Sequence, residues 1–532
     1  MSTATARTVS LHGAIGHVVD VQVDVSPGQV GLTMVGRPDL SLRESGDRCR
    51  MAVLNSDLPW PVTKRTTILL SPADLLKRGP HFDLAVALAV LAAQQHLPPQ
   101  VLPDLAVMGE LTLDGRLRCV PGVLPMALAA AARGLRGVIV PEPQVPEAVL
   151  VPGLEVVGVR SLAQAVALLR GQEVPEAPAV EPPSVSRVLA WRGEQRLDDL
   201  DLADLRGMAD AKFAAEVAAA GGHPLLLTGP KGGGKTSIAE RLPSLLPDLS
   251  PEEALELTAV HSLAGTLPPG HGLMTRPPFS APHHDASKAS IVGGGSRQVR
   301  PGELSRTHAG VLFLDEFPLF RTDIIEALRE PLENGDITIA RTEESVTLPA
   351  RGLLVLAANP CPCGDHDPVS GRSTCTCRAT ALRDYQNKLH GPVADRIDLR
   401  RHVGPLSRHE GDPLRDPDTS AVVRARVAAA RERQAARYAG CGWRLNAHAP
   451  STALRDRWPL AGSAAALLEE TVYTGRLSSR GAVRVHRVAW TLADLEAVRT
   501  GRDVVPGPRE LDLALSLRCG DPLPASLWER CG

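Results

Sequence analysis

Residues 229–236 read Gly229-Pro230-Lys231-Gly232-Gly233-Gly234-Lys235-Thr236, and this stretch decides the fold of the chain. An apolar segment at 224–228 precedes it and predicts a strand, and a helix is expected to begin near Ser237. The spacing G-x-x-x-x-G-K-[ST] between a strand and a helix is typical of a loop whose backbone N–H groups hold phosphates. We therefore predict a nucleoside triphosphate site lined by Gly229 to Ser237. Lys235 is expected to reach the β- and γ-phosphates, and Thr236 to bind Mg²⁺.

Two later apolar segments end in polar residues suited to hydrolysis. Residues 311–314 are followed by Asp315 and Glu316, and residues 353–358 are followed by Asn359. Behind a phosphate loop, Asp315 is predicted to bind Mg²⁺ and Glu316 to polarise the attacking water. The Asn359 amide is predicted to orient that water, although an asparagine before a proline also favours a plain turn.

Length and composition indicate a large protein with several cores. The chain has 532 residues, 43% of them hydrophobic, and a net charge of −2. The charge predicts no global attraction to nucleic acid, so any such partner must be bound by a local patch. No apolar run approaches the roughly 18 residues that span a bilayer. We expect a soluble, cytoplasmic protein that does not bind a membrane.

The pattern of the chain predicts four zones. Residues 1–170 alternate short strands and helices, residues 171–196 form a proline-rich linker, residues 197–403 contain the α/β core, and residues 404–532 are mostly helical. In the last zone three helices are predicted, at 420–438, 453–474 and 480–500.

Two arginines stand near turns and helix starts in the second half. Arg396 lies in the segment 391–398, and Arg480 follows two serines at the start of a predicted helix. Arg396 could act on the nucleotide of a neighbouring subunit, and Arg480 on the γ-phosphate of its own. Because the chain has fifty-one arginines, surface salt bridges are the alternative for both.

Four cysteines occur within seventeen residues, at Cys361, Cys363, Cys375 and Cys377. Thiolates are soft ligands that can complete a tetrahedral Zn²⁺ site, although C-x-C spacing is tighter than usual. We predict a structural zinc site, in which His366 could replace one ligand. Reduced free thiols in a loop are the alternative.

About eighty residues separate the phosphate loop from Asp315, which is longer than a minimal crossover between parallel strands. The glycine-rich segment 278–302 carries three cations, Lys288, Arg297 and Arg300. We predict that these cations contact DNA phosphates, and a solvated surface loop is the alternative. Residues 337–348 predict a hairpin with Arg341 near its tip, a second candidate for DNA contact.

Motifs spread over nearly the whole chain resemble the ComM/YifB family of competence-associated helicases, within the Mg-chelatase-like group of AAA+ ATPases. The resemblance implies an AAA+ core with a helical lid, and a homohexamer that hydrolyses ATP with Mg²⁺ and drives DNA branch migration in natural transformation. It also implies Asn359 as sensor 1, Arg396 as a finger acting in trans and Arg480 as sensor 2. The matching stretches are 55–57, 71–75, 82–84, 109–115, 281–284, 292–295, 301–304 and 359–364.

The first zone resembles the α+β proteolytic domain of Lon proteases, with the fold of ribosomal protein S5 domain 2. In that family a serine follows Gly-Pro, but here His81 follows Gly79-Pro80. No lysine occurs between Lys77 and Lys212, so a Ser/Lys dyad cannot be assembled. We expect a non-catalytic domain for oligomerisation or DNA contact. Two other functions stay open: a metal-chelatase motor subunit, and a regulatory ATPase scaffold that does not translocate.

Overall fold

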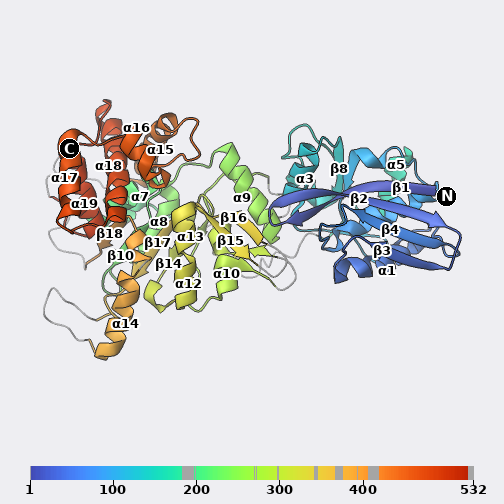
Figure 1. The fold of residues 1–532 in the computed structure, drawn as a ribbon, viewed down its shortest axis with the longest axis horizontal. Coiled ribbons are helices and arrows are strands. Elements are labelled where there is room, and N and C mark those ends of the chain that lie inside the picture. Colours follow the sequence, from blue (N-terminus) through green and yellow to red (C-terminus); the bar gives the residue numbers. More distant parts are fainter. Residues whose placement is uncertain are drawn as a thin grey trace.

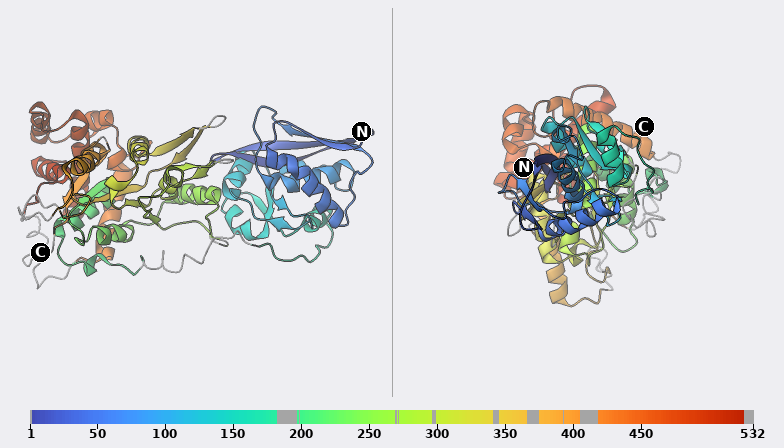
Figure 2. Two further views of the ribbon diagram at one scale, coloured as in Figure 1. Left: turned by 90° about the horizontal axis from the view of Figure 1, so that it is seen from below. Right: turned by 90° about the vertical axis from the view of Figure 1, so that its right-hand side faces the viewer.

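The computed structural model describes residues 2–181, 197, 199–268, 270, 272–295, 299–340, 345–365, 375–391, 393–404 and 418–524. The molecule is elongated, with an N-terminal α/β unit at one end and a cluster of helices near the C-terminus at the other (Figure 1). A second α/β unit lies between them, and its helix α14 projects from the body (Figures 1 and 2). Within the described residues, no helix is both long enough and apolar enough to cross a membrane.

The N-terminal unit is built on a mixed seven-stranded sheet in the order β3-β4-β2-β1-β5-β8-β9. Helix α2 is buried along its entire length, which explains why its sequence is apolar on all sides. The strands are β1 (Ser2–His12), β2 (Ile15–Ser26), β3 (Gly31–Val35), β4 (Arg65–Ser71), β5 (Leu105–Val107), β8 (Gly137–Pro141) and β9 (Glu155–Val159), with a small ribbon of β6 (Glu110–Leu111) and β7 (Leu117–Arg118). The helices are α1 (Leu40–Asn55), α2 (Asp83–Ala93), α3 (Val123–Ala132), α4 (Val145–Ala148) and α5 (Leu162–Arg170).

The central unit contains a parallel five-stranded sheet in the order β11-β14-β17-β10-β18. β10, β14 and β17 are neighbours, so the residues after their carboxyl ends meet at one edge, where ligands bind in open α/β sheets. The strands are β10 (Leu225–Thr228), β11 (Phe279–Ser280), β14 (Val311–Leu314), β17 (Leu353–Ala358) and β18 (Leu399–His402). The helices are α7 (Ala209–Gly221), α8 (Lys235–Leu245), α9 (Pro251–Ala264), α10 (Lys288–Val292), α11 (Glu303–Arg306), α12 (Thr322–Ala327), α13 (Arg329–Asn334) and α14 (Ala379–His390).

Two antiparallel ribbons extend this unit. β12 (Gly293–Gly294) pairs with β13 (Arg300–Pro301), and β15 (Asp336–Ala340) pairs with β16 (Ser345–Pro349). The hairpin predicted at 337–348 is therefore confirmed. The segment that carries Lys288 differs from the expected loop, since Lys288 begins the short helix α10.

The C-terminal zone is helical, as predicted, and consists of α15 (Ser420–Arg437), α16 (Ser451–Arg457), α17 (Gly462–Tyr473), α18 (Ser479–Thr500) and α19 (Pro508–Cys519). The single helix predicted at 453–474 is wrong, because α16 ends at Arg457 and α17 begins at Gly462. Pro459 lies between them, and a proline in a helix interior removes a backbone hydrogen bond and clashes with the preceding turn. Helices α15, α17, α18 and α19 share one hydrophobic core with α7, α8 and the core sheet, whereas Leu454 of α16 packs in a smaller cluster with Tyr438 and Trp490.

The N-terminal and central units are in direct contact. Helix α3 packs against α9, and the Gly122 N–H donates to the Ser262 carbonyl at 3.0 Å. The buried carboxylate of Glu147 accepts a hydrogen bond from the Ser262 hydroxyl. At the β1–β2 turn, a Cβ built on Gly13 would lie only 2.1 Å from Cγ1 of Val346 on β16. The N-terminal unit therefore rests on both α9 and the β15–β16 hairpin.

Candidate active site

The loop after β10 has the backbone of a phosphate cradle. Gly229, Gly232 and Gly234 have φ values of 149°, 74° and 91°, which side chains other than glycine rarely adopt. A Cβ at Gly229 would lie 2.1 Å from the Val403 carbonyl oxygen. Helix α8 begins at Lys235, two residues before the predicted start, and no side chain caps its first N–H groups. These donors and the positive end of the helix dipole therefore point at the place where an anion would bind.

Lys235 joins the phosphate loop to the end of β17. Its Nζ donates to the carbonyls of Gly229 and Pro230 at 2.8 Å each, and to Oδ1 of Asn359 at 3.0 Å. Burial lowers the pKa of Lys235, while the nearby charges of Asp315 and Glu316 act in the opposite direction. The sequence predicts that Lys235 and Asn359 both act near the γ-phosphate. In the structure these two side chains are in direct contact.

Thr236, at the start of α8, faces the two carboxylates that follow β14. The Thr236 hydroxyl donates to Oδ2 of Asp315 at 3.0 Å, and the Glu316 N–H donates to Oδ1 of Asp315 at 2.8 Å. Glu316 has a left-handed backbone, with φ at 50°. An acidic residue in this conformation is uncommon and often marks a functional site. A hydroxyl beside a carboxylate is an oxygen pair suited to Mg²⁺.

A histidine that the sequence did not assign to the site approaches Glu316. His284 Nδ1 is 3.6 Å from the Glu316 carboxylate, and the ring of His283 lies 4.1 Å from that of His284. The ligand atoms of His283, His284 and Asp285 lie within 4.8 Å of one another. In the sequence, residues 281–284 contribute only to the family resemblance. They follow β11, which pairs with β14, and this explains why they reach the carboxylate.

The two predicted arginines are placed differently from each other. Arg396 is 9% exposed, and its Nε donates to Glu333 on α13 at 2.7 Å. Arg480 is exposed at the second residue of α18. One turn later on the same helix, Arg484 is buried and pairs with Asp398 at 2.5 Å. Arg396 is therefore held in an intramolecular ion pair, whereas Arg480 is exposed at the start of α18.

Asp398 is part of a buried network that was not predicted. Its Oδ2 is 2.7 Å from Nδ1 of His223, whose Nε2 is 2.7 Å from the Thr491 hydroxyl. Burial acts to raise the pKa of Asp398, but the Arg484 charge and the His223 hydrogen bond outweigh it and hold this pKa well below its usual range. The network ties the starts of β10 and β18 to α18. No local pattern in the sequence indicates this network, because Asp398 lies 175 positions from His223 and 86 positions from Arg484.

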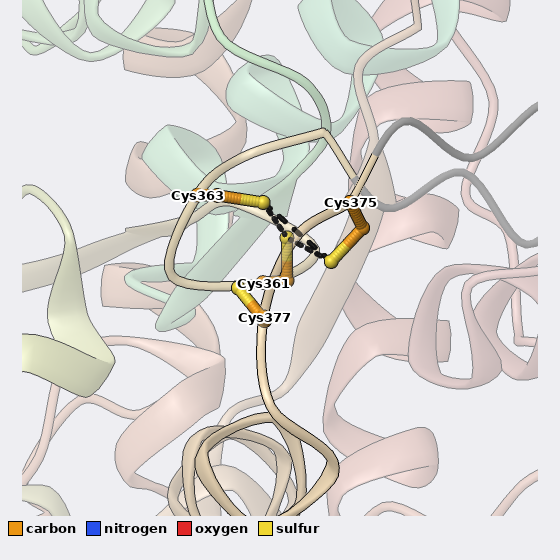
Figure 3. Close-up of side chains that lie close together, drawn as sticks. All are labelled: Cys361, Cys363, Cys375 and Cys377. Atoms are coloured by element: carbon orange, nitrogen blue, oxygen red, sulfur yellow. Dashed lines mark hydrogen bonds between the residues drawn. The ribbon is translucent and has the colours of Figure 1, made fainter.

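The four cysteines converge in a loop between β17 and α14 (Figure 3). The Sγ atoms of Cys361 and Cys363 are 3.2 Å apart, and Cys375 Sγ lies 3.5 Å from Cys363 and 3.6 Å from Cys361. Cys377 completes a set in which all four sulfurs lie within 4.8 Å. This cluster could hold a metal. His366, the predicted substitute ligand, lies outside the described residues.

The candidate DNA contacts are only partly within the described residues. Lys288 and Arg300 are exposed, on α10 and β13. Arg297 and Arg341 lie outside the described residues, so their predicted roles stay predictions.

In the N-terminal unit, His81 occupies the position after Gly79-Pro80. Its Nε2 is 2.8 Å from the Val9 carbonyl, and burial lowers the pKa of His81 to about 4. Lys77 is also buried, and its Nζ contacts the Pro72 carbonyl. Both side chains are thus held by backbone carbonyls.

Comparisons with known proteins agree with this geometry. Three protein families match: Magnesium chelatase, subunit ChlI, over residues 201–410; Subunit ChlI of Mg-chelatase, over 21–144; and Magnesium chelatase, subunit ChlI C-terminal, over 417–518. An uncharacterized protein of Mycobacterium tuberculosis strain H37Rv is 46% identical over 518 residues, covering 97% of this chain and 99% of the relative.

Two further relatives also match over nearly their full length. YifB of Escherichia coli strain K12 is 40% identical over 501 residues, and Competence protein ComM of Haemophilus influenzae strain Rd is 38% identical over 498 residues. Each alignment covers 93% of this chain and 94% of the relative. Lon protease 2 of Thermus thermophilus is 29% identical over 143 residues, which is 26% of this chain and 18% of that protease. The fold is therefore an AAA+ core with a helical lid, preceded by a Lon-like α/β unit.

Proposed function

We propose, from the premise that this chain belongs to the ComM/YifB family of magnesium-chelatase-like AAA+ proteins, that it is an ATP-driven motor that moves branched DNA during natural transformation and recombination. The observation that carries the proposal is the contact of Lys235 with Asn359 beside the contact of Thr236 with Asp315. These four side chains lie after the ends of three neighbouring strands, and in this proposal they surround the phosphates of a bound nucleotide. Such an assembly is what phosphoryl transfer needs, because its catalysis depends on positioning and charge.

Each residue of the site has a specific task in this proposal. Lys235 exchanges its backbone carbonyl partners for the β- and γ-phosphates of ATP. Thr236 and Asp315 bind Mg²⁺, Glu316 polarises the attacking water, and Asn359 orients it. The remaining loop residues, Gly229 to Gly234 and Ser237, surround the phosphates, and the backbone N–H groups of Lys231, Gly232, Gly234 and Ser237 are proposed as the donors; Pro230 has no N–H, and those of Gly229 and Gly233 donate to backbone carbonyls. Mg²⁺ supplies charge neutralisation on the phosphate oxygens.

The proposed working form is a homohexamer in which subunits act on one another. Arg396 reaches the γ-phosphate of the neighbouring subunit after leaving Glu333, whose side chain is 44% exposed. Arg480 acts within its own subunit, and its exposed position at the start of α18 leaves it room to move. An arginine at the transferring phosphate commonly contributes a factor of 10³–10⁵ in rate.

DNA contact is proposed for the cations of the segment before β14 and for the β15–β16 hairpin. Lys288 and Arg300 are exposed there, and a net charge of −2 leaves DNA binding to such local groups. The Lon-like unit, residues 1–170, is proposed to serve oligomerisation or DNA contact without catalysis. Residues 171–196 are proposed as the linker, 197–403 as the ATPase core and 404–532 as the lid region. A protein that acts on DNA in this way works in the cytoplasm.

The four-cysteine cluster is proposed to bind a structural Zn²⁺. Ligand bonds of about 2.3 Å in a tetrahedron place sulfur atoms roughly 3.8 Å apart. The measured separations of 3.2, 3.5 and 3.6 Å are close to that value. Four thiolates are also the donor set that favours zinc over the harder magnesium ion.

The decisive experiment combines ATP hydrolysis and strand movement. Purified protein should migrate a synthetic four-way junction with ATP, and DNA should stimulate its ATPase. Lys235→Ala should abolish both activities, and Glu316→Gln should bind ATP without hydrolysing it. Arg502→Ala, which removes an exposed cation after α18, is the control and should behave as the wild type.

The other outcomes identify the competing functions. ATP hydrolysis that responds to a porphyrin-binding partner and not to DNA indicates a metal-chelatase motor. Hydrolysis with no strand movement on any junction indicates a regulatory scaffold. A particle that stays monomeric with ATP, measured by mass photometry, contradicts the proposed use of Arg396.

A further inference from the structure

The four-cysteine loop touches the nucleotide site itself. Gly364, directly after Cys363, has φ at 85°, and a Cβ built there would lie 2.7 Å from Cε and 2.9 Å from Cγ of Lys231. The Lys231 side chain therefore lies across the backbone of the cysteine loop. Lys231 is the third residue of the phosphate loop, so this contact joins the two loops without any intervening element.

The other end of the cysteine loop is also fixed to the site. Cys377 directly precedes the cap residue of α14, and Tyr385 on that helix is buried close to the Asn359 backbone. Lys388, one turn further, donates to the carbonyls of Pro318 and Phe320 at 3.0 and 3.2 Å, in the turn that follows Glu316. Helix α14 thus contacts both the backbone of Asn359 and the turn that follows Glu316.

The cysteine cluster is the point at which these two sets of contacts meet. Cys361 and Cys363 belong to the strand side, and Cys375 and Cys377 to the helix side (Figure 3). The three short sulfur contacts given above include two that cross between the sides. A metal bonded to all four sulfurs would lock the turn at Gly364 to the start of α14.

We infer that zinc in the four-cysteine cluster controls nucleotide binding, because it holds the turn at Gly364 against Lys231 and anchors α14 behind Asn359. This inference rests on the proposed ATP and zinc sites and adds a dependence of one on the other. Contacts that hold the ligands of a metal in place typically change metal affinity or activity by about 10- to 100-fold, and we expect the loop that supports the phosphate site to act with a similar magnitude. ATP affinity should accordingly fall about 10-fold or more when zinc leaves.

The test uses the full-length protein and a fluorescent ATP analogue. Zinc per chain is measured by elemental analysis, and the dissociation constant is measured as purified, after chelation, and after zinc is added back. Chelation should weaken binding about 10-fold or more, and added zinc should restore it. Cys375→Ser should bind weakly without chelation and should not respond to zinc, while Cys441→Ser, a cysteine outside the cluster, should match the wild type.

Two further variants test the contact and guard against misfolding. Gly364→Ala pushes on Lys231 and should weaken ATP binding while the zinc content stays unchanged. In Lys231→Met, chelation should weaken ATP binding much less than in the wild type, because the substitution alters the side chain through which the cysteine loop acts on the phosphate loop. Circular dichroism must stay the same on chelation; a change in fold, or a loss of binding that zinc does not reverse, overturns the inference.

The outcomes separate this inference from the proposed function. If the zinc-loaded protein binds ATP and migrates junctions but the zinc-free protein binds ATP equally well, the inference is wrong and the proposed function stands. A purified protein that contains no zinc and is fully active would also show that the inference is wrong and that the proposed function stands. If the zinc-loaded protein binds no ATP, both are wrong.

Discussion

Replacing Asp398 with asparagine should separate the lid from the core, because this residue carries the only negative charge in the buried network described above. The carboxylate is fully buried and contacts Arg484 at 2.5 Å and His223 at 2.7 Å. Asparagine has nearly the same shape, so the substitution removes the charge and leaves the Arg484 side chain, 10% exposed, without its counterion. Removing one partner of a buried ion pair costs about 3–5 kcal/mol.

This cost can be measured as a shift of thermal unfolding. For domains of roughly 150–250 residues, 1 kcal/mol corresponds to about 2–4 °C, so Asp398→Asn should lower the midpoint by about 10 °C. Asp323→Asn is the matched control, since Asp323 pairs with Arg321 at the surface, where both side chains are well exposed. Exposed pairs contribute about 0–1 kcal/mol, so the control should shift the midpoint by a few degrees at most.

A double variant and a pH series complete the test. Asp398→Asn combined with Arg484→Met removes both charges and should recover much of the loss, because an apolar replacement of a buried pair is often neutral. The lowered pKa of Asp398 means that its contribution is present above its unfolded pKa of 3.8 and is lost as pH falls below it. Midpoints for Asp398→Asn and Asp323→Asn that agree within about 2 °C at pH 7 would refute the reasoning.

Two more predictions concern the N-terminal unit and the phosphate loop. Burial lowers the pKa of His81 from 6.5 to about 4, so stability is full above pH 6.5 and falls by about 2 kcal/mol between pH 7 and pH 5; His81→Gln should lack this component in thermal unfolding at the two pH values. Gly229→Ala forces a Cβ to 2.1 Å from a backbone oxygen and should weaken ATP binding more than about 10-fold, whereas Gly501→Ala, at φ 68° in open space, should leave binding unchanged. An unchanged dissociation constant for Gly229→Ala, or the same pH response in His81→Gln as in the wild type, would contradict these arguments.

The parts of the site that the sequence predicted are those fixed by local chemistry. Apolar segments followed by glycines, by Asp315 and by Asn359 marked three strand ends, and neighbouring parallel strands bring such ends together. The hairpin at 337–348 was also local, since alternating apolar residues specify both its strands. Spacing alone therefore led to the phosphate cradle and to the pair of Thr236 and Asp315.

The parts that the sequence missed depend on long-range packing. Arg396 and Glu333 are sixty-three positions apart, and nothing in either neighbourhood indicates the other. Asp398 and His223 are separated by 175 positions. The helix predicted at 453–474 is an error that the sequence itself contradicts. Pro459 lies inside this range, and a proline in a helix interior breaks or kinks the helix.

The contact between the Lon-like unit and the hairpin restricts how the proposed motor can work. The β1–β2 turn rests on Val346 of the hairpin, and the buried Glu147 carboxylate receives a hydrogen bond from Ser262 on α9. Burial raises the pKa of Glu147, and the hydrogen bonds from the Ser262 hydroxyl and the Leu124 N–H act in the opposite direction. A hairpin that moves along DNA must either slide against the β1–β2 turn or carry the Lon-like unit with it. In the second case the α3–α9 contact persists only if α9 moves too, so the hairpin, α9 and the Lon-like unit would then move as one body.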